Sequence, residues 1–496
     1  RAAAAAMGPL VSVTTAYHRS VETDRAVTPT RGTMGEALVV GSIGTLLLLA
    51  YEWVLLTFAS DRLFAGYRFQ AWSSNDFMQE VKIQDLVDAG PVALWYLHVQ
   101  PPVLEALRLL LSFPEYLTGG TMTAQMIDQR MYVMYAVFFG VLLFTVFLWV
   151  RTLTRSRAWA YVGAVAIGAY PGTIAMATLL DGTFPSAVLA TVMLFLLYLA
   201  IRQGSPRLLN WWLLSLVLLS FTRTIFQLQI LIFMPVVVFL LYRYRMRRAK
   251  PVAIALSVVL TGSLFVLPAK QYVLYDTTAT TSFAGNHQIE VVSYRPTDTE
   301  LAAVEVPPDI IENAEQFDSG FNSPENVELN FILTQVGNDY YLRDPSQVAK
   351  NLLWGVQMNT FQAFRWTHDY SIVGAGPANV AADLLPWTPP SSVVLSWAFY
   401  WLVILVTVGA LLYVYGVRGL IQLVRRYAAL AFIIATTMLT FLLANRYDWT
   451  EADRLKYILV PFFCIVFVST IGRAAQKARA RRESTAREPA LESRPI

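Results

Sequence analysis

Asp76 is the residue whose type and position most directly suggest chemistry. It follows the first long hydrophobic stretch of the chain, and a Pro101-Pro102 pair comes later in the same polar loop. A carboxylate held at the outer face of a membrane can take a proton from an acceptor hydroxyl, which is general-base chemistry. A nearby apolar interface should raise the pKa of such a carboxyl toward neutral pH. The alternative is that Asp76 only caps a helix that begins beside it.

The composition is that of a polytopic membrane protein. Hydrophobic residues make up 56% of the 496 positions and charged residues only 15%, whereas soluble domains carry about 25% charged residues. The net charge of +4 does not indicate nucleic-acid binding, because the basic residues gather at the ends of the hydrophobic stretches. Cys464 is the only cysteine, which excludes a disulfide within the chain.

The hydrophobic stretches predict an all-α integral membrane fold with about ten transmembrane helices. They lie near residues 37–59, 131–151, 158–176, 184–201, 209–222, 225–242, 252–269, 393–415, 427–444 and 456–472. The 209–242 region could instead form a re-entrant pair. Lys and Arg gather in alternate connections and in the tail, so the positive-inside rule places both termini in the cytoplasm.

This topology predicts five parts. They are a disordered cytoplasmic N-terminus (1–36), a transmembrane module (37–269) with an outer loop at 60–130, a large extracytoplasmic loop (270–392), C-terminal transmembrane helices (393–472) and a basic cytoplasmic tail (473–496).

Helices are also expected outside the membrane. Apolar spacing predicts an amphipathic helix over 76–89, which Gly90-Pro91 should end, and a second one over 102–113. Asp344-Pro345 should start a helix that runs to about residue 364, with Asp344 as its N-cap.

The first outer loop resembles that of the GT-C superfamily, which are membrane glycosyltransferases that use polyprenyl-phosphate sugars. Relatives include bacterial and actinobacterial arabinosyl-, mannosyl- and aminoarabinose transferases. Their loop often reads as an acidic residue, a helix, a glycine and then His-Pro-Pro-Leu. Here the corresponding residues are Asp76, Gly90 and His98-Val99-Gln100-Pro101-Pro102-Val103-Leu104. The inserted Val99-Gln100 departs from the pattern, and so does Phe77, where many members have a second acid.

The last outer loop is similar to the family's as well. GT-C members often end with a Glu, a basic residue, an aromatic turn and a Pro in the final span. This chain has Glu451, Arg454, Lys456, Tyr457 and Pro461 in that order. The resemblance implies a GT-C-like bundle with its active site on the outer face of the cytoplasmic membrane.

The resemblance implies Asp76 as the catalytic base and a set of cations for the donor phosphate. The candidates for the phosphate are Arg223, Arg446, Arg454 and Lys456. Arg223 lies between two apolar runs, where an ionisable residue is a functional hypothesis, but its side chain could also snorkel to lipid headgroups. The other three could instead form a salt-bridge cluster with acids of the same loop.

Further residues could bind the sugar or the acceptor. The candidates are Asp181, His98, Gln100, Glu451 and His368. Asp181 could instead cap the helix that follows it, and the histidines could be ordinary polar surface. The dispersed histidines give no close ligand pair, so no metal site is predicted. No cofactor is implied, although a divalent cation stays open.

The resemblance therefore favours an inverting glycosyltransferase with a polyprenyl-phosphate sugar donor and a cell-envelope glycan or glycolipid acceptor. Arabinose and mannose are the favoured sugars, and membrane lipid is the surrounding partner. The alternative is a transporter or flippase of a lipid-linked sugar, which would place charges at the membrane midplane and show repeat symmetry. A scaffold without catalysis is the third interpretation.

Overall fold

The computed structural model describes residues 31–54, 81–178, 180, 182–223, 226, 239, 251–279, 281–282, 284–291, 294–361, 393–444 and 457–492. Within these ranges the regular structure is helical, and the only strand-like pairing is a bridge between Ser319 and Asn322. The predicted all-α membrane architecture is confirmed for this part of the chain.

Five of the described helices are long and apolar enough to cross a membrane. They are α3 (Arg31–Val54), α9 (Ala124–Thr154), α12 (Thr183–Gln203), the consecutive α15 (Pro251–Ser263) and α16 (Val266–Tyr275), and α23 (Val393–Arg426). A pair bent by 62°, α10 (Arg157–Gly168) and α11 (Pro171–Thr178), would be a sixth if it forms one span. The count of ten stays a prediction, since most of 225–242 lies outside the described residues.

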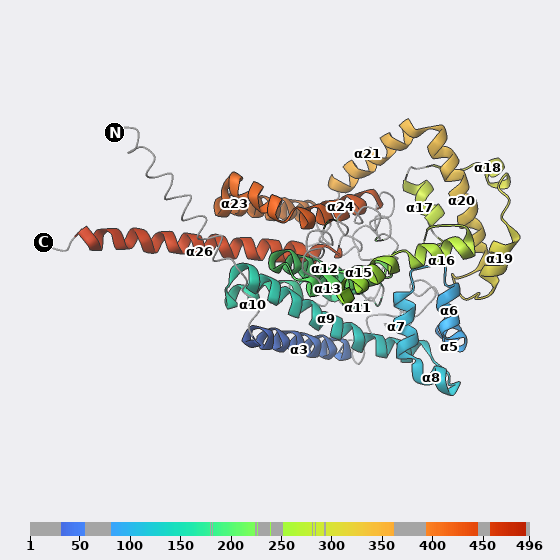
Figure 1. Ribbon diagram of the computed structural model, residues 1–496, viewed down its shortest axis with the longest axis horizontal. Coiled ribbons are helices and arrows are strands. Elements are labelled where there is room, and N and C mark those ends of the chain that lie inside the picture. The colour runs from blue at the N-terminus through green and yellow to red at the C-terminus, as the bar shows by residue number, and fades with distance from the viewer. Residues whose placement is uncertain are drawn as a thin grey trace.

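Other helices complete the bundle and build the part beyond it (Figure 1). Apolar helices are α13 (Pro206–Ser220), α24 (Ala428–Ala444) and the long α26 (Val460–Glu492). The first loop contains α5 (Ile83–Ala89), α6 (Pro91–Tyr96), α7 (Val103–Leu111) and α8 (Phe113–Thr118). The large loop contains α17 (Ala284–Val291), α18 (Asp298–Ala302), α19 (Pro308–Glu315), α20 (Pro324–Arg343) and α21 (Pro345–Phe361).

The helix boundaries predicted from local sequence signals agree in part with the structure. The first loop helix begins at Ile83 and not at residue 76, because Lys82 has extended backbone angles, so Asp76 is not its N-cap. It ends at Gly90, as expected. Gly90 has a φ of 59°, and a Cβ at this position would lie 2.3 Å from the Tyr116 ring. Both the backbone conformation and the lack of space therefore favour glycine. Asp344 does cap α21, since its Oδ1 accepts from Gln347 N at 3.0 Å.

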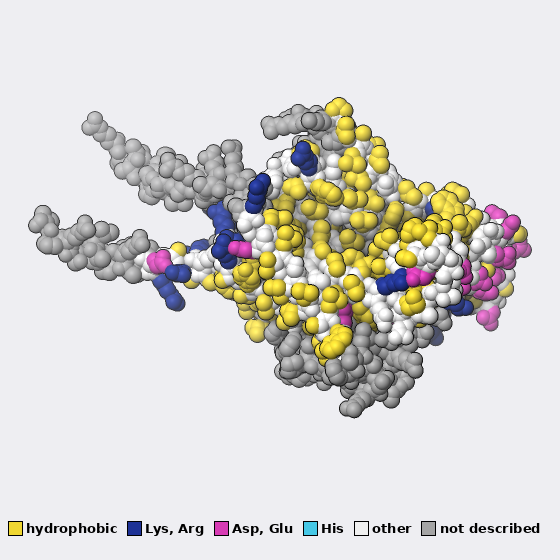
Figure 2. All heavy atoms as spheres, turned by 90° about the horizontal axis from the view of Figure 1, so that it is seen from below, with side chains coloured by type: hydrophobic (Ala, Val, Ile, Leu, Met, Phe, Trp, Pro, Cys, Tyr) yellow, Lys and Arg dark blue, Asp and Glu magenta, His cyan; other side chains and the backbone are white. Residues whose placement is uncertain are grey.

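The two ends of the molecule carry opposite charge (Figure 2). Residues 294–345 contain eleven Asp or Glu and two Arg, and they form the end far from the C-terminus. At the other end α26 contacts the last turn of α9 and the middle of α23. Arg473 Nε donates to Leu153 O at 2.8 Å, and Lys477 Nζ donates to Tyr413 O at 2.7 Å. The end of α9, Tyr413 of α23 and the 473–477 part of α26 therefore lie together, and the membrane side of this region stays a prediction.

The core is organised around α9, which α3, α10, α12 and α26 all contact. The α3 contact is close because glycines face each other. A Cβ at Gly140 of α9 would lie 2.1 Å from Thr45 Oγ1 and 2.7 Å from Gly41 O, and one at Gly44 would lie 2.4 Å from Leu143. Small residues of this kind let membrane helices approach closely, where dispersion contacts replace the missing hydrophobic driving force.

This contact predicts a large effect of a side chain at Gly140. Gly140→Val should lower the free energy of unfolding by about 1–3 kcal/mol, because α3 must move away from α9. Gly409→Val is the matched control, since no atom lies within 4 Å of a Cβ at that position of α23. Thermal unfolding in detergent measures both, and equal shifts would argue against the close α3–α9 contact.

Candidate functional site

The structure describes three of the candidate site residues. His98, Gln100 and Arg223 lie in described segments. The others lie outside the described residues, so their roles stay predictions. These are Asp76, Asp181, His368, Arg446, Glu451, Arg454 and Lys456.

The irregular segment from Tyr96 to Val99 is the centre of the described site. It links α6 to the Pro101-Pro102 turn, and distant side chains hold its carbonyls. Lys270 Nζ donates to Leu97 O at 2.5 Å, Tyr275 Oη donates to Tyr96 O at 2.8 Å, and Thr281 Oγ1 donates to Val99 O. Backbone that lies outside regular structure must find such partners when it is buried.

The N–H groups of the same segment are held by one amide side chain. Asn322 Oδ1 accepts from His98 N at 2.8 Å and from Val99 N at 3.2 Å. Asn322 is fully buried, and its Nδ2 donates to Phe317 O at 2.6 Å. The turn around Ser319 and Asn322 thus clamps the first outer loop to the large one, which joins two parts of the chain that are 224 residues apart.

His98 is buried with both ring nitrogens unpartnered among the described residues. Its exposed fraction is 2%, and Tyr275 meets its ring edge-on at a centroid distance of 5.3 Å. Burial first, and then the charge of Lys270, lower the pKa of His98 to about 3. The imidazole is therefore neutral near pH 7, with one nitrogen able to donate and the other able to accept.

Lys270 is a buried lysine in the last two turns of the α15–α16 span, and α16 lies on the side opposite the basic end of the protein. Its exposed fraction is 7%, and within the described part of the chain it has no carboxylate partner. Its ammonium donates to the single carbonyl of Leu97. A buried charge without a counter-charge is costly, and an anion brought to this position would offset that cost. Lys270 and His98 together could bind an anionic, oxygen-rich group.

Gln100 belongs to a buried polar network in the same loop. Its Nε2 donates to Glu105 Oε1 at 2.7 Å, and Arg108 Nη1 donates to Glu105 Oε2 at 2.6 Å. Burial raises the pKa of Glu105, and the charge and hydrogen bond of Arg108 offset part of that rise. Gln100 thus contributes to the structure of the loop, and its amide is engaged in the described fold.

Arg108 of this network and Ser319 of the large loop also hold the backbone of Val81 and Lys82. Arg108 Nη1 also donates to Val81 O at 2.9 Å, and Ser319 Oγ accepts from Lys82 N at 3.1 Å. Val81 and Lys82 are therefore anchored to α7 and to the Ser319 turn.

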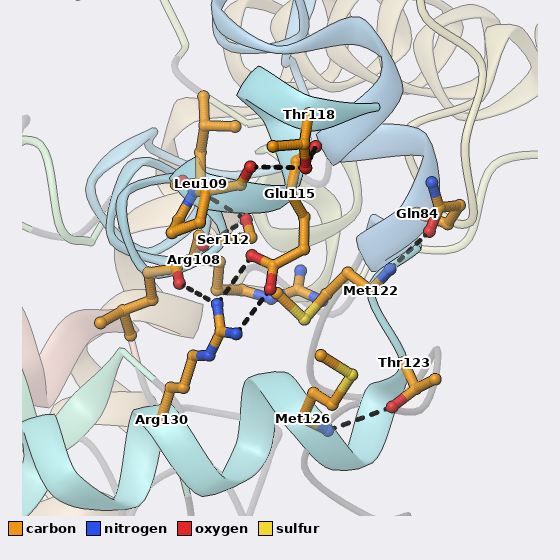
Figure 3. A network of polar contacts seen from close by, with 12 residues as sticks. Gln84, Arg108, Leu109, Ser112, Glu115, Thr118, Met122, Thr123, Met126 and Arg130 are labelled. Carbon is orange, nitrogen blue, oxygen red and sulfur yellow. Dashed lines mark hydrogen bonds and ion pairs between the residues drawn. The ribbon is translucent and has the colours of Figure 1, made fainter. Parts of the chain in front are cut away.

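A second ion pair attaches the loop to the membrane bundle (Figure 3). Arg130, in the second turn of α9, donates to both carboxylate oxygens of Glu115 on α8 at 2.6 and 2.8 Å, and to Leu111 O. The hydrogen bond from Arg130 is the main reason that the pKa of Glu115 is lowered. Bidentate Arg–carboxylate pairs fix orientation as well as distance, so α8 is held beside the start of α9.

Arg223 lies close to the loop but in its own polar group. Its Nη2 donates to Thr183 Oγ1 at 2.6 Å, and a Cβ at Gly182 would lie 3.4 Å from its Nε. Phe221 O accepts from Val103 N at 3.0 Å, directly after the Pro101-Pro102 pair. The structure therefore brings the Arg223 turn to the loop that contains His98.

Sequence reasoning missed Lys270, Glu105, Arg108 and Asn322. Lys270 directly follows a predicted span, and a lysine at that boundary normally reaches the lipid headgroups. The neighbouring sequence therefore does not predict that Lys270 is buried. Glu105 and Arg108 are three residues apart on a helix, and this spacing predicts an ion pair. The sequence does not predict that both side chains are completely buried. The described residues contain no group of three metal-ligating side chains.

No protein-family model matches the chain, and no curated protein matches it in sequence. The resemblance to the GT-C superfamily therefore depends on the loop residues quoted above.

The buried pair Glu105–Arg108 should matter far more than an exposed pair of similar spacing. Glu105→Gln leaves the buried Arg108 charge uncompensated and should lower the free energy of unfolding by about 3–5 kcal/mol. Glu483→Gln, which removes the partner of Arg479 in a pair with 84% and 57% exposed side chains, should cost less than about 1 kcal/mol. Unfolding by increasing SDS in mixed micelles compares the two, and similar losses would contradict the assigned burial.

His98 should make stability depend on pH. The unfolded His98 binds a proton below about pH 6.5, whereas the folded one does so only near pH 3. Stability should therefore fall as the pH drops from 6.5, by up to about 1.4 kcal/mol per pH unit from this group. His98→Phe should flatten the fall of the unfolding midpoint between pH 6.5 and 4.5, and parallel curves for the two proteins would exclude a buried neutral His98.

Proposed function

We propose that the protein is an inverting glycosyltransferase of the GT-C type. It would move a sugar, with arabinose or mannose favoured, from a polyprenyl-phosphate donor to a cell-envelope glycan or glycolipid. The reaction would take place on the outer face of the cytoplasmic membrane. The observation that carries the proposal is the buried Lys270 beside the unpartnered His98, at the membrane-helix end that meets the Pro101-Pro102 loop.

This arrangement suits a lipid donor with an anionic head. The isoprenoid chain would lie along the apolar helices, and its phosphate would reach the end of the α15–α16 span. Lys270 and Arg223 would hold the phosphate there, joined by Arg446, Arg454 and Lys456 of the last outer loop. Cations placed in a site that excludes water stabilise the charge that builds on the leaving phosphate.

Asp76 would act as the general base. The acceptor hydroxyl gives its proton to the carboxylate as its oxygen attacks the anomeric carbon of the sugar. The bond from that carbon to the phosphate oxygen breaks on the opposite face, so the configuration inverts and polyprenyl phosphate leaves with both bonding electrons. His98, Asp181, Glu451 and His368 would orient sugar or acceptor hydroxyls. No metal ion takes part in this scheme, although a divalent cation near the phosphate is compatible with it.

Transfer from labelled donors tests this proposal. The purified chain is reconstituted in vesicles with a panel of polyprenyl-phosphate sugars, and wild type is compared with Asp76→Asn. The variant should lose about 100-fold to 10,000-fold in turnover, as expected for removal of a general base, and should still bind the donor. Asp88→Asn is the matched control, because Asp88 is an exposed acid of the same loop, and it should transfer at the wild-type rate.

Two outcomes would overturn the proposal. Full turnover by Asp76→Asn would remove Asp76 as the base. Movement of an intact donor across the vesicle membrane, with no sugar transferred to any acceptor, would favour the transporter instead.

A further inference from the structure

The last ten residues of α23 form a segment that is separate from the membrane span before it. Gly416 has φ 65° and ψ 171°, which breaks the helical geometry inside α23. Residues 417–426 then continue as a helix, and α24 begins after Tyr427. The segment 417–426, here called the connector helix, therefore joins two apolar helices at the basic end of the protein.

The helix α26 fixes the point where the connector helix begins. Lys477 Nζ donates to the carbonyls of Tyr413 and Val414 at 2.7 and 2.9 Å. Arg473 donates to Tyr415 Oη, and its guanidinium lies 5.6 Å from the centre of that ring. The turn before Gly416 is thus held by several polar contacts, so the kink has a defined direction.

One face of the connector helix is apolar and exposed. Val417, Ile421 and Val424 expose 64%, 47% and 56% of their surface. Steps of four and three residues place them on one side of a helix. Leu420 and Leu423 are only partly exposed, so the helix has a second, more protected side toward the protein.

Basic side chains flank this apolar face. Arg418 and Arg425 are exposed and lie seven residues apart, which places them two turns apart on the same side of the helix. Arg426 is exposed as well, with its guanidinium 5.7 Å from the centre of the Tyr427 ring. Residues 393–444 contain these three arginines, no lysine and no acidic residue. The charge of the connector helix is therefore uncompensated along its own part of the chain.

The apolar span before the kink is exposed as well. Leu402, Leu405 and Leu412 expose 56%, 66% and 43% of their surface, and the described part of the span has no buried residue in its most apolar window. An apolar face with basic flanks is typical of helices that lie in the plane of a membrane interface.

We propose that the connector helix binds anionic phospholipids of the leaflet at the basic end of the protein. Val417, Ile421 and Val424 would enter the boundary between headgroups and acyl chains, and Arg418 and Arg425 would contact lipid phosphates. Two arginines beside a negatively charged surface each raise the affinity roughly fivefold, so the pair should account for a preference of about 25-fold over a zwitterionic lipid. This binding is independent of the transfer reaction at the opposite end.

Native mass spectrometry of the full chain tests the proposal. Protein in detergent is mixed with dioleoylphosphatidylglycerol or with dioleoylphosphatidylcholine, and the lipid molecules retained on each protein are counted. Wild type should retain the anionic lipid at concentrations about 25-fold lower than the zwitterionic one. Arg418→Gln with Arg425→Gln should remove most of this preference.

A matched control separates the connector helix from general charge. Arg479→Gln with Arg482→Gln removes the same charge from the tail of α26 and should keep the wild-type preference. Ile421→Ser should weaken retention of both lipids, because it removes part of the apolar face.

Three results would overturn the proposal. Equal loss in the tail control would show that any basic residue suffices, and equal retention of both lipids by wild type would show that the face has no headgroup preference. A dimer seen for wild type and absent for the double connector variant would assign the face to a second copy of the chain.

Discussion

The irregular backbone from Tyr96 to Val99 depends on hydrogen-bond partners that its own neighbourhood does not supply. Its carbonyls and N–H groups are buried against the end of a membrane bundle, where unsatisfied backbone groups cost several kcal/mol each. Lys270 and Tyr275 from α16, and Asn322 from the large loop, provide those partners. The position of the loop, of His98 and of the Pro101-Pro102 turn follows from these contacts. Three parts of the chain must therefore fold together before the site exists.

The membrane bundle and the polar part beside it are held together by different interactions. The bundle around α9 is held by close packing, with glycines between α3 and α9 and aromatic rings such as Trp149 against Phe195 and Phe462. The part built from the two loops has only a small hydrophobic core. Polar contacts attach it to the bundle, as the ion pair between Arg130 and Glu115 does for α8. A close-packed bundle therefore carries a polar cap that hydrogen bonds and an ion pair attach to it.

Much of the fold was readable from the sequence, because lipid permits few backbone structures. The long apolar stretches predicted α3, α9, α12 and α23 near their observed positions, and Gly90 and Asp344 marked helix boundaries correctly. The helix predicted from residue 76 begins instead at Ile83. The site was less readable. Lys270 and Leu97 are 173 residues apart, and no local pattern reports that such a lysine will be buried. The roles of Asp76 and of the last outer loop stay predictions.

Glu52 has a consequence for how the protein is made. It is 2% exposed and lies on the same stripe of α3 as Gly41 and Gly44, which meet α9. Residues 55–123 separate the two helices, so α3 leaves the ribosome well before its partner does. Until α9 arrives, this carboxyl has no protein to cover it, and an acidic residue in a lone span disfavours insertion. The first helix should therefore wait at the translocon and enter the bilayer together with α9, as a pair.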